Sequence, residues 1–481
     1  MEWYWLLLAL LGSILILMFA GIPVGIAFLA VCTVTAYHLY GRFGGFDDHL
    51  SSAIFQLIEN AFSNMANFAI VPIPMFLLMG ELFFHTGLAK RMFNAIEQLL
   101  GRVPARLSYV TVGGGTALAT LSGSSMGATA LLGTLMVPEM TQRGYKKHMS
   151  IGPILGTGGL AMLIPPSALA VLLGTIAEID IGKLLIAGIL PGLILATFYA
   201  ILIFVRATLD PEAAPAYELE ESTWTKRLRL FATDVVPMVS IIFMVIGLIM
   251  LGVATPSEAA AYGCVGVIIL AGYYLLAIPL AKGIVASIRG TENAGHHWRE
   301  CAAFVPFFGR AFWQSLWGAA RVTVVALLIL LGSSLFSNVL AASGASVALI
   351  EWVTSFDVSA YVMLGMMLCI LLLLGMFMDQ LAMMLLTVPI FFPVIAGLDF
   401  GMELPVVQIW FGVIMLLAME ISFTTPPFGL LLFVMQGVAP PGTRFGEICM
   451  AALPFIGCSM LLVALIIAFP QLAVWLPFLI E

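Results

Sequence analysis

The chain has 481 residues, of which 62% are hydrophobic and only 9% are charged, and its mean hydropathy is +1.11. No water-soluble fold of this size can bury so much apolar surface, so the composition excludes a soluble globular protein. The formal net charge of -7 argues against a nucleic-acid partner.

Apolar runs long enough to cross a lipid bilayer follow one another along the chain, which predicts an all-α polytopic membrane protein. The first run has no basic start and no convincing cleavage site, so we expect it to be retained as a span. The six cysteines are scattered and predict packing residues. Helices are expected at about 3–20, 22–40, 54–84, 107–142, 148–178, 182–206, 232–253, 257–280, 312–340, 358–396, 406–437 and 446–479.

Three pairs of similar runs recur in the same order in the two halves, which indicates an internal repeat. Repeats of this kind are typical of secondary transporters, whose substrate and ions bind near broken helices at the membrane midplane. The pairs are LMGELFFHTGLAKRMFNAI at Leu78 with LLGSSLFSNVLAASGASVALI at Leu330, IPPSALAVLLG at Ile164 with TPPFGLLLFVM at Thr425, and AGILPGLILA at Ala187 with AALPFIGCSM at Ala451.

The charges that flank two long apolar segments predict re-entrant hairpins entering from opposite sides. Basic residues flank 107–142 at both ends, which favours the cytoplasm for both, so we expect hairpin 1 here with its turn at 122–125. Acidic residues alone flank 359–398, so hairpin 2 should enter from the periplasm. Opposite entry is what an inverted repeat predicts.

Small and polar residues at membrane depth mark the expected ion-binding places, because irregular backbone survives there only inside protein or beside water. In the hairpin 1 run LSGSSMGAT, hydroxyls and freed carbonyls would form a shell of hard oxygens that suits Na⁺. Close packing of small residues is the simpler alternative. The hydroxyls belong to Ser122, Ser124, Ser125 and Thr129.

Two double prolines predict broken helices beside the hairpins, with a simple kink as the alternative in each case. The run GTGGLAMLIPPS places Gly156 and Gly159 before Pro165 and Ser167. The run MEISFTTPPFG repeats the device in the second half. It carries Thr424, Thr425 and Pro426.

Acids within apolar runs are costly and are usually functional. Asp379, in hairpin 2, should meet a cation or a paired donor, and Glu81 and Glu420 are weaker candidates as ligands, protonation sites or partners of buried polar groups. Basic residues are scarce in the spans, so an anionic substrate would depend on backbone amides, hydroxyls and helix N-termini. Lys183 and Arg321 are expected to be interfacial anchors, with the alternative that they donate hydrogen bonds to an anionic substrate. The absence of metal-binding, nucleophile and nucleotide motifs predicts that the chain is not an enzyme.

Together, GIPVGIAFL at Gly21, LSGSSMGATALLGTLMVPEM, the IPPS at Ile164, GMFMDQLAMMLLTVPIFFPV at Gly375 and FTTPPFGLLLFV at Phe423 resemble the DctM-type large membrane subunit of tripartite ATP-independent periplasmic (TRAP) transporters. The resemblance covers nearly the whole chain. It implies a multi-pass protein of the bacterial inner membrane that takes up a small organic anion, a carboxylate or a sulfonate. It also implies Na⁺ coupling without an organic cofactor, an elevator-type movement as in the ion transporter superfamily, a small four-helix membrane subunit and a periplasmic binding protein.

The same resemblance implies where ions and substrate bind, and each set remains an expectation. Sodium site 1 would comprise Ser122, Ser124, Ser125, Gly156 and Gly159, and sodium site 2 would comprise Asp379, Thr424 and Thr425. The substrate would meet Ser124, Thr129, Pro165, Ser167 and Pro426.

The expected division of the chain alternates scaffold and transport segments. These are 1–100, scaffold helices of the first repeat; 101–206, the first transport half with hairpin 1; 207–229, a linker; 230–356, scaffold helices of the second repeat; and 357–481, the second transport half with hairpin 2. The charged stretch 281–311 departs from the family pattern and is expected to be an amphipathic helix on the membrane, a contact for the small subunit or an unconstrained loop.

Two other functions stay open from the sequence. A stand-alone Na⁺/dicarboxylate carrier of the wider ion transporter superfamily would share the hairpins and repeats but would need no binding protein. An intramembrane enzyme such as a protease would need paired catalytic residues on adjacent helices, and the sequence offers none.

Overall fold

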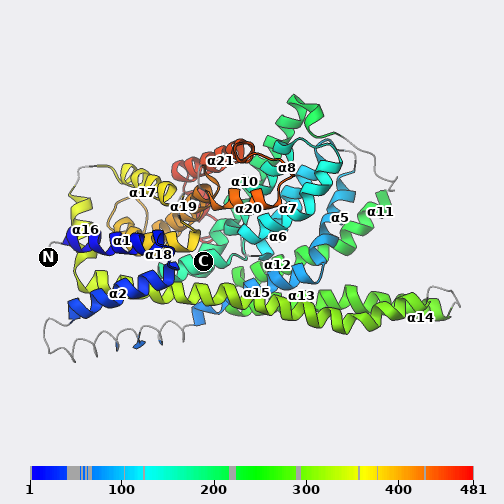
Figure 1. Ribbon diagram of the computed structural model, residues 1–481, viewed down its shortest axis with the longest axis horizontal. Coiled ribbons are helices and arrows are strands. Elements are labelled where there is room, and N and C mark those ends of the chain that lie inside the picture. Colours follow the sequence, from blue (N-terminus) through cyan, green and yellow to red (C-terminus); the bar gives the residue numbers. More distant parts are fainter. Residues whose placement is uncertain are drawn as a thin grey trace.

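The computed structural model describes residues 3–40, 68–101, 103–122, 125–215, 224–288, 294–355, 358–375, 378–426 and 429–479, with four isolated positions between 41 and 67. All regular structure in this part of the chain is helical (Figure 1). The first half comprises α1 (Trp3–Phe19), α2 (Val24–Tyr40), η2 (Phe68–Ile70), α4 (Pro72–His85), α5 (Leu88–Leu100), α6 (Arg106–Ser122), α7 (Ser125–Gln142), α8 (Lys147–Leu163), α9 (Ala168–Ile176), α10 (Ile181–Leu209) and η3 (Pro211–Ala213).

The second half follows the same plan after a short helix. Its elements are α11 (Trp224–Leu230), η4 (Phe231–Val235), α12 (Val236–Met250), α13 (Pro256–Gly272), η5 (Tyr273–Ala277), α14 (Ile278–Ile288), α15 (Ala294–Ala342), α16 (Ala345–Thr354), α17 (Ala360–Gly375), α18 (Gln380–Ala396), α19 (Leu404–Thr424), α20 (Leu430–Val438), α21 (Phe445–Ala468) and α22 (Gln471–Val474).

Within the described residues, six helices are long and apolar enough to cross a membrane, or up to eight if each of two bent pairs is one span. The bent pairs are α4 with α5, at 67°, and α8 with α9, at 45°. The expected all-α polytopic membrane fold is therefore confirmed. The expected run 54–84 is represented by α4 at its end, and most of 54–67 lies outside the described residues.

The repeat that the sequence suggests is visible in the order of elements and in their turns. In the first half, α4 turns into α5 at Gly87, whose φ is 77°, and in the second half α15 turns into α16 at Gly344, whose φ is 72°. Both residues lie in the left-handed region, where glycine carries no steric penalty. A packed helix pair follows each turn, α6 with α7 and α17 with α18, at the positions expected for the two hairpins.

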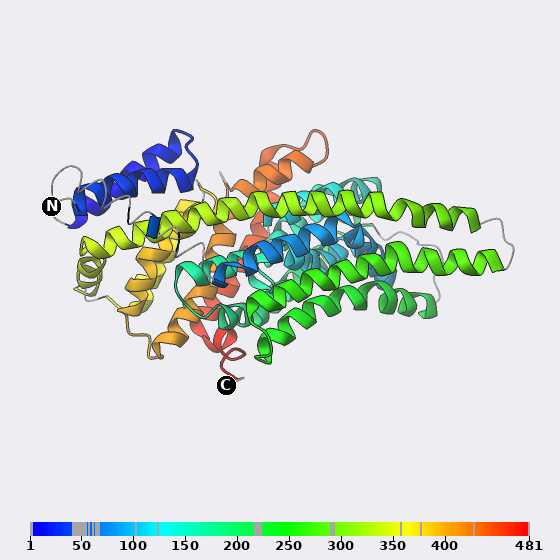
Figure 2. The ribbon, with the colours of Figure 1, turned by 90° about the horizontal axis from the view of Figure 1, so that it is seen from below.

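Two stretches differ from the sequence expectation. Residues 88–100, for which we expected no helix, form α5, whose apolar face packs on α6. The stretch 281–311 was expected to be a polar break between spans, but α14 and α15 occupy its described part, so the unconstrained-loop interpretation is wrong there. Figure 2 shows α14 and the start of α15 side by side at one end of the molecule. Since α15 has 49 residues, it is about 74 Å long at 1.5 Å per residue, more than a bilayer core requires.

The helices fall into two packed groups, and α19 lies in the middle of the second. One group joins α2, α4, α13 and α15, along the lower edge of Figure 1. The other surrounds α19, which contacts α8 and α10 from the first half and α17, α18 and α21 from the second. In the apolar 18-residue stretch of α19, 78% of the residues are buried, whereas this share is 22% to 50% in the other five spans. The best-buried part of the fold is therefore where the broken helices and hairpins meet.

Candidate functional site

The first break, between α8 and α9, is stabilised by a cap on the helix that follows it. Pro165 and Pro166 have no backbone N–H and cannot continue α8. Ser167, which is fully buried, accepts a hydrogen bond at its Oγ from the backbone N–H of Ala170 (3.2 Å), and so caps α9. The predicted substrate contacts Pro165 and Ser167 thus lie in one buried turn whose geometry the cap fixes.

The second break, between α19 and α20, is stabilised by hydroxyls on the helix that precedes it. Thr424 Oγ1 donates to the carbonyl oxygens of Glu420 (3.1 Å) and Ile421 (3.0 Å). Thr425 Oγ1 donates to the Ile421 carbonyl as well (2.5 Å). Both hydroxyl hydrogens are therefore used within α19, and only their lone pairs remain for a ligand. Pro426, beside them, is partly exposed.

Asp379 ends the turn of hairpin 2 as the N-cap of α18. Its Oδ1 accepts a hydrogen bond from the backbone N–H of Ala382 (2.9 Å). This is the paired donor that the sequence analysis offered as one alternative. Among the described residues, no hydrogen bond joins Asp379 to Thr424 or Thr425, so sodium site 2 stays a prediction.

Glu420 brings residues of both hairpins together. Its side chain is only 3% exposed, and its Oε2 accepts hydrogen bonds from Ser125 Oγ, at the start of α7, and from Gln380 Nε2, at the start of α18, both at 3.4 Å. Its carboxylate also lies against α8, because a Cβ added at Gly159 would be 2.3 Å from Oε1. One carboxylate therefore contacts both hairpins and the helix before the first break.

The remaining predicted residues divide into those near this carboxylate and those elsewhere. Gly156 lies on the far side of Glu420, against Phe455 and Tyr199. Thr129 is fully buried beside Gly158, and its Oγ1 has no hydrogen-bond partner within the described residues. Ser124 lies outside the described residues, and nothing is described of the Ser122 side chain.

Glu81 belongs to a different place. It pairs with His85 on α4 (Oε2 to Nδ1, 3.3 Å) and packs against Gly318 of α15. No described contact connects it to the breaks, so it is not part of the site around Glu420.

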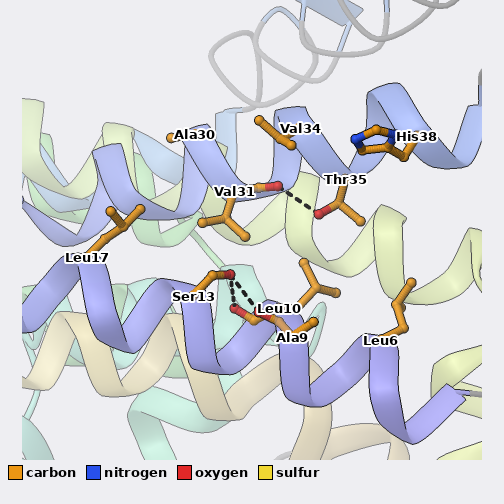
Figure 3. A pocket seen from close by; sticks show the side chains of 10 residues that line it. All are labelled: Leu6, Ala9, Leu10, Ser13, Leu17, Ala30, Val31, Val34, Thr35 and His38. Atoms are coloured by element: carbon orange, nitrogen blue, oxygen red, sulfur yellow. Dashed lines mark hydrogen bonds between the residues drawn. The ribbon is translucent and has the colours of Figure 1, made fainter.

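A hollow between α1 and α2 offers little chemistry. Figure 3 shows its mostly apolar wall, in which the Ser13 hydroxyl donates to the Ala9 carbonyl (2.6 Å) and the Thr35 hydroxyl to the Val31 carbonyl (2.8 Å). Each hydroxyl is thus satisfied within its own helix. His38, at the rim, is the one ionisable residue on the wall.

A family model for the DctM component of tripartite ATP-independent periplasmic transporters matches residues 11–472. The chain belongs to this family. It is therefore a multi-pass protein of the bacterial inner membrane and the large permease subunit of a TRAP transporter. The transport role of the family supports a protein that is not an enzyme, and membership implies a small membrane subunit and a periplasmic binding protein as partners.

Relatives of this DctM component transport different acids. It is 29% identical to a C4-dicarboxylate TRAP large permease protein of Pseudomonas aeruginosa, over 88% of this chain and 89% of that one. It is 27% identical to the isethionate TRAP permease protein DctMQ of Oleidesulfovibrio alaskensis, over 94% of this chain but 63% of that one. It is 25% identical to the sialic acid large permease protein SiaM of Vibrio cholerae, over 96% of both. The solved structure of Neisseria gonorrhoeae MtrF shares the fold, with a TM-score of 0.55, 11% identity and 92% and 94% coverage.

Sequence reasoning missed Gln380, Tyr199 and Ser459, which lie beside Glu420 or share its cavity. The one local signal was for Gln380, a second polar residue directly after Asp379 in an apolar run. Tyr199 and Ser459 meet across 260 positions, with 2.9 Å between their hydroxyl oxygens, and nothing in either helix alone announces the pair.

Proposed function

We propose that this DctM component takes up a small organic anion, a carboxylate or a sulfonate, by Na⁺-coupled secondary transport. The proposal rests on the contact of Glu420 with both hairpins. A buried carboxylate in a membrane interior is costly unless a partner compensates it, and a coupling cation is such a partner. Relatives named for C4-dicarboxylate, isethionate and sialic acid support an anionic substrate.

The two breaks and the two hairpin turns offer groups that can bind an anion, and none of these groups is a basic side chain. Within the described residues, no lysine or arginine contacts Ser167, Glu420 or Asp379. The N-termini of α9 and α20, which follow the breaks, present backbone N–H groups and the positive end of the helix dipole. We propose Pro165, Ser167 and Pro426 as substrate contacts at these breaks, and Ser124 and Thr129 as substrate contacts in hairpin 1. Sodium site 1, at hairpin 1 and Gly156 to Gly159, and sodium site 2, at Asp379, Thr424 and Thr425, remain our assignment of the ion ligands.

The movement we propose is of the elevator type. The group of helices around α19 carries both hairpins, and the group of α2, α4, α13 and α15 would stay fixed in the bilayer. The helices α5 and α16 connect the two groups. Each follows a glycine turn, and the two turns occupy equivalent positions in the two repeats. A small four-helix membrane subunit and a periplasmic binding protein would complete the transporter.

Uptake into liposomes tests this function. The chain and its small partner subunit are reconstituted, and uptake of a radiolabelled C4-dicarboxylate, isethionate or sialic acid is measured with and without an inward Na⁺ gradient and the binding protein. We expect uptake of one of these acids to require both the Na⁺ gradient and the binding protein. Uptake without any binding protein would favour the stand-alone carrier, and uptake indifferent to Na⁺ would contradict the coupling.

An Asp379→Ala variant is assayed in parallel, with Asp399→Ala as its control. Asp399 is an exposed acid beyond the other end of α18. We expect Asp379→Ala to lose Na⁺-driven uptake and Asp399→Ala to retain it. Equal uptake by the two variants would remove Asp379 from sodium site 2.

A further inference from the structure

A small cavity lies behind Glu420, on the side away from the hairpin turns. Four helices enclose it, α8, α10, α19 and α21, and its volume is about 10 Å³, which is room for about one water-sized particle. Its polar wall consists of Glu420, Thr424, Tyr199 and Ser459, and the rest of the lining is apolar apart from the backbone at Gly156. All four polar residues are at most 6% exposed. The cavity is therefore polar on one wall and lined by buried polar side chains.

The hydroxyl hydrogens around this cavity are already used. Thr424 donates to carbonyls of its own helix, and Ser459 Oγ donates to the Phe455 carbonyl (3.2 Å). The hydrogen bond between Tyr199 and Ser459 (2.9 Å) must then be donated by the Tyr199 hydroxyl. What these hydroxyls can still offer a ligand is lone pairs, so the described polar wall accepts and does not donate.

The charge of the wall has no described counterpart. Both hydrogen bonds to the Glu420 carboxylate fall on Oε2, and both are long at 3.4 Å. Within the described residues, no lysine, arginine or histidine pairs with it. Leaving an ionised carboxylate buried and unpaired costs several kcal/mol. An acceptor-only wall with one negative charge is complementary to a cation and repels an anion.

We propose that this cavity binds one Na⁺ ion, held by the Glu420 carboxylate and the hydroxyl oxygen of Ser459. One carboxylate charge matches a monovalent ion, whereas sites for Ca²⁺ usually combine several acidic oxygens. The inference rests on the proposed Na⁺ coupling and adds an ion position to those at the hairpin turns. Because Glu420 also contacts Ser125 and Gln380, an ion in the cavity acts on both hairpins through one side chain.

Thermal unfolding of the purified chain in detergent tests the site without requiring transport. NaCl is titrated against choline chloride at constant ionic strength, and the Na⁺ concentration that gives half of the stabilisation is measured. We expect Glu420→Gln, which keeps the shape and removes the charge, to raise this concentration at least tenfold. We expect Ser459→Ala to raise it severalfold, although Ser459 makes no described contact with either hairpin.

Glu447→Gln is the matched control, because Glu447 is exposed at the start of α21 and pairs with Lys147. It should leave the Na⁺ response unchanged. If Glu420→Gln and Ser459→Ala both fold and respond to Na⁺ as the wild type does, while uptake remains Na⁺-coupled, the cavity site is wrong and the proposed function stands. If the wild type shows neither Na⁺ stabilisation nor Na⁺-driven uptake, both proposals fail.

Discussion

The broken helices of the two halves, α8 with α9 and α19 with α20, meet at one pair of equivalent positions that carry different residues. When the IPPS run at Ile164 is aligned with the TPPF run at Thr425, Gly159 and Glu420 each lie five residues before the break. The structure places these two residues in contact, with the glycine backbone against the carboxylate. One half thus supplies the charge and the other supplies the space for it.

The difference between Gly159 and Glu420 shows how two repeats can share one buried carboxylate. Two carboxylates facing each other here would repel in a low-dielectric interior. A single carboxylate instead serves both hairpins, through Ser125 in the first half and Gln380 in the second. The predictions below test which contacts of the two halves are equivalent, beginning with the largest expected effect.

The contact between α8 and α10 should tolerate no side chain at Gly188. A Cβ added there would lie 2.0 Å from the backbone carbonyl oxygen of Leu163, at the end of α8. The second half has two alanines, Ala451 and Ala452, where the first has Ala187 and Gly188. We expect Gly188→Ala to destabilise the protein by about 1–3 kcal/mol or more, because backbone must move. Thermal unfolding in detergent measures this.

Two variants show whether the cost is specific to the first half. Gly247→Ala, in α12, adds a Cβ with no atom within 4 Å and should not destabilise the protein. Ala452→Gly should cost only about 1 kcal/mol, the difference in helix propensity. A Gly188→Ala protein that melts like the wild type would show that α10 can move away from α8 freely.

The pair Gly159 and Glu420 should show coupling in a double-mutant cycle. Gly159→Ala would place its Cβ 2.3 Å from Oε1, so the carboxylate must shift toward the neighbouring cavity. We expect a cost of about 1–3 kcal/mol, the usual range for overpacking, because the small cavity gives the carboxylate little room. In the Glu420→Ala background the same substitution should cost clearly less. Additive effects, measured by thermal unfolding, would contradict the contact between the halves.

The sequence was enough to predict the repeats, the broken helices and the positions of both hairpins, because prolines, glycines and charges act locally on the backbone. It did not identify Glu420 as the centre of the contacts, and it ranked Asp379 higher. The reason is that Ser125 and Glu420 are 295 positions apart, and a contact over that separation leaves no local pattern. The helix at 88–100 and the helical extension of α15 were missed because their residues are polar enough to look like loops.

The caps of α18 and α9 lie at different positions of the two halves, one at a hairpin turn and the other at a helix break. Asp379 caps the first helix turn of α18, and Ser167 does the same for α9. We expect Asp379→Ala and Ser167→Ala each to cost about 1 kcal/mol in thermal unfolding, because each removes an N-cap.

Asp379→Ser separates the cap from ion binding. Serine can cap the helix, so we expect near wild-type stability, but it lacks the charge proposed for sodium site 2. Na⁺-driven uptake should fall as far as in Asp379→Ala. A serine variant that transports normally would assign Asp379 a capping role alone.

The two ion pairs at the start of α8 should contribute least to stability. One lies within the first half, and the other joins the first half to the second. Lys146 pairs with Asp210 at the end of α10 (2.6 Å), and Lys147 with Glu447 at the start of α21 (2.8 Å). Both pairs are substantially exposed, so solvent screens them. We expect Asp210→Asn and Glu447→Gln to lower the melting temperature only slightly, the effect shrinking further in high salt.

The pair within the first half should also have a pH signature. The hydrogen bond from Lys146 holds the pKa of the Asp210 carboxyl below its ordinary value. The stabilisation is therefore complete above that ordinary value and is lost as the pH falls through the lowered pKa. Melting temperatures of the wild type and Asp210→Asn should thus differ slightly at neutral pH and converge in strong acid. A difference that persists in acid would mean that the Asp210 side chain acts through packing and not through its charge.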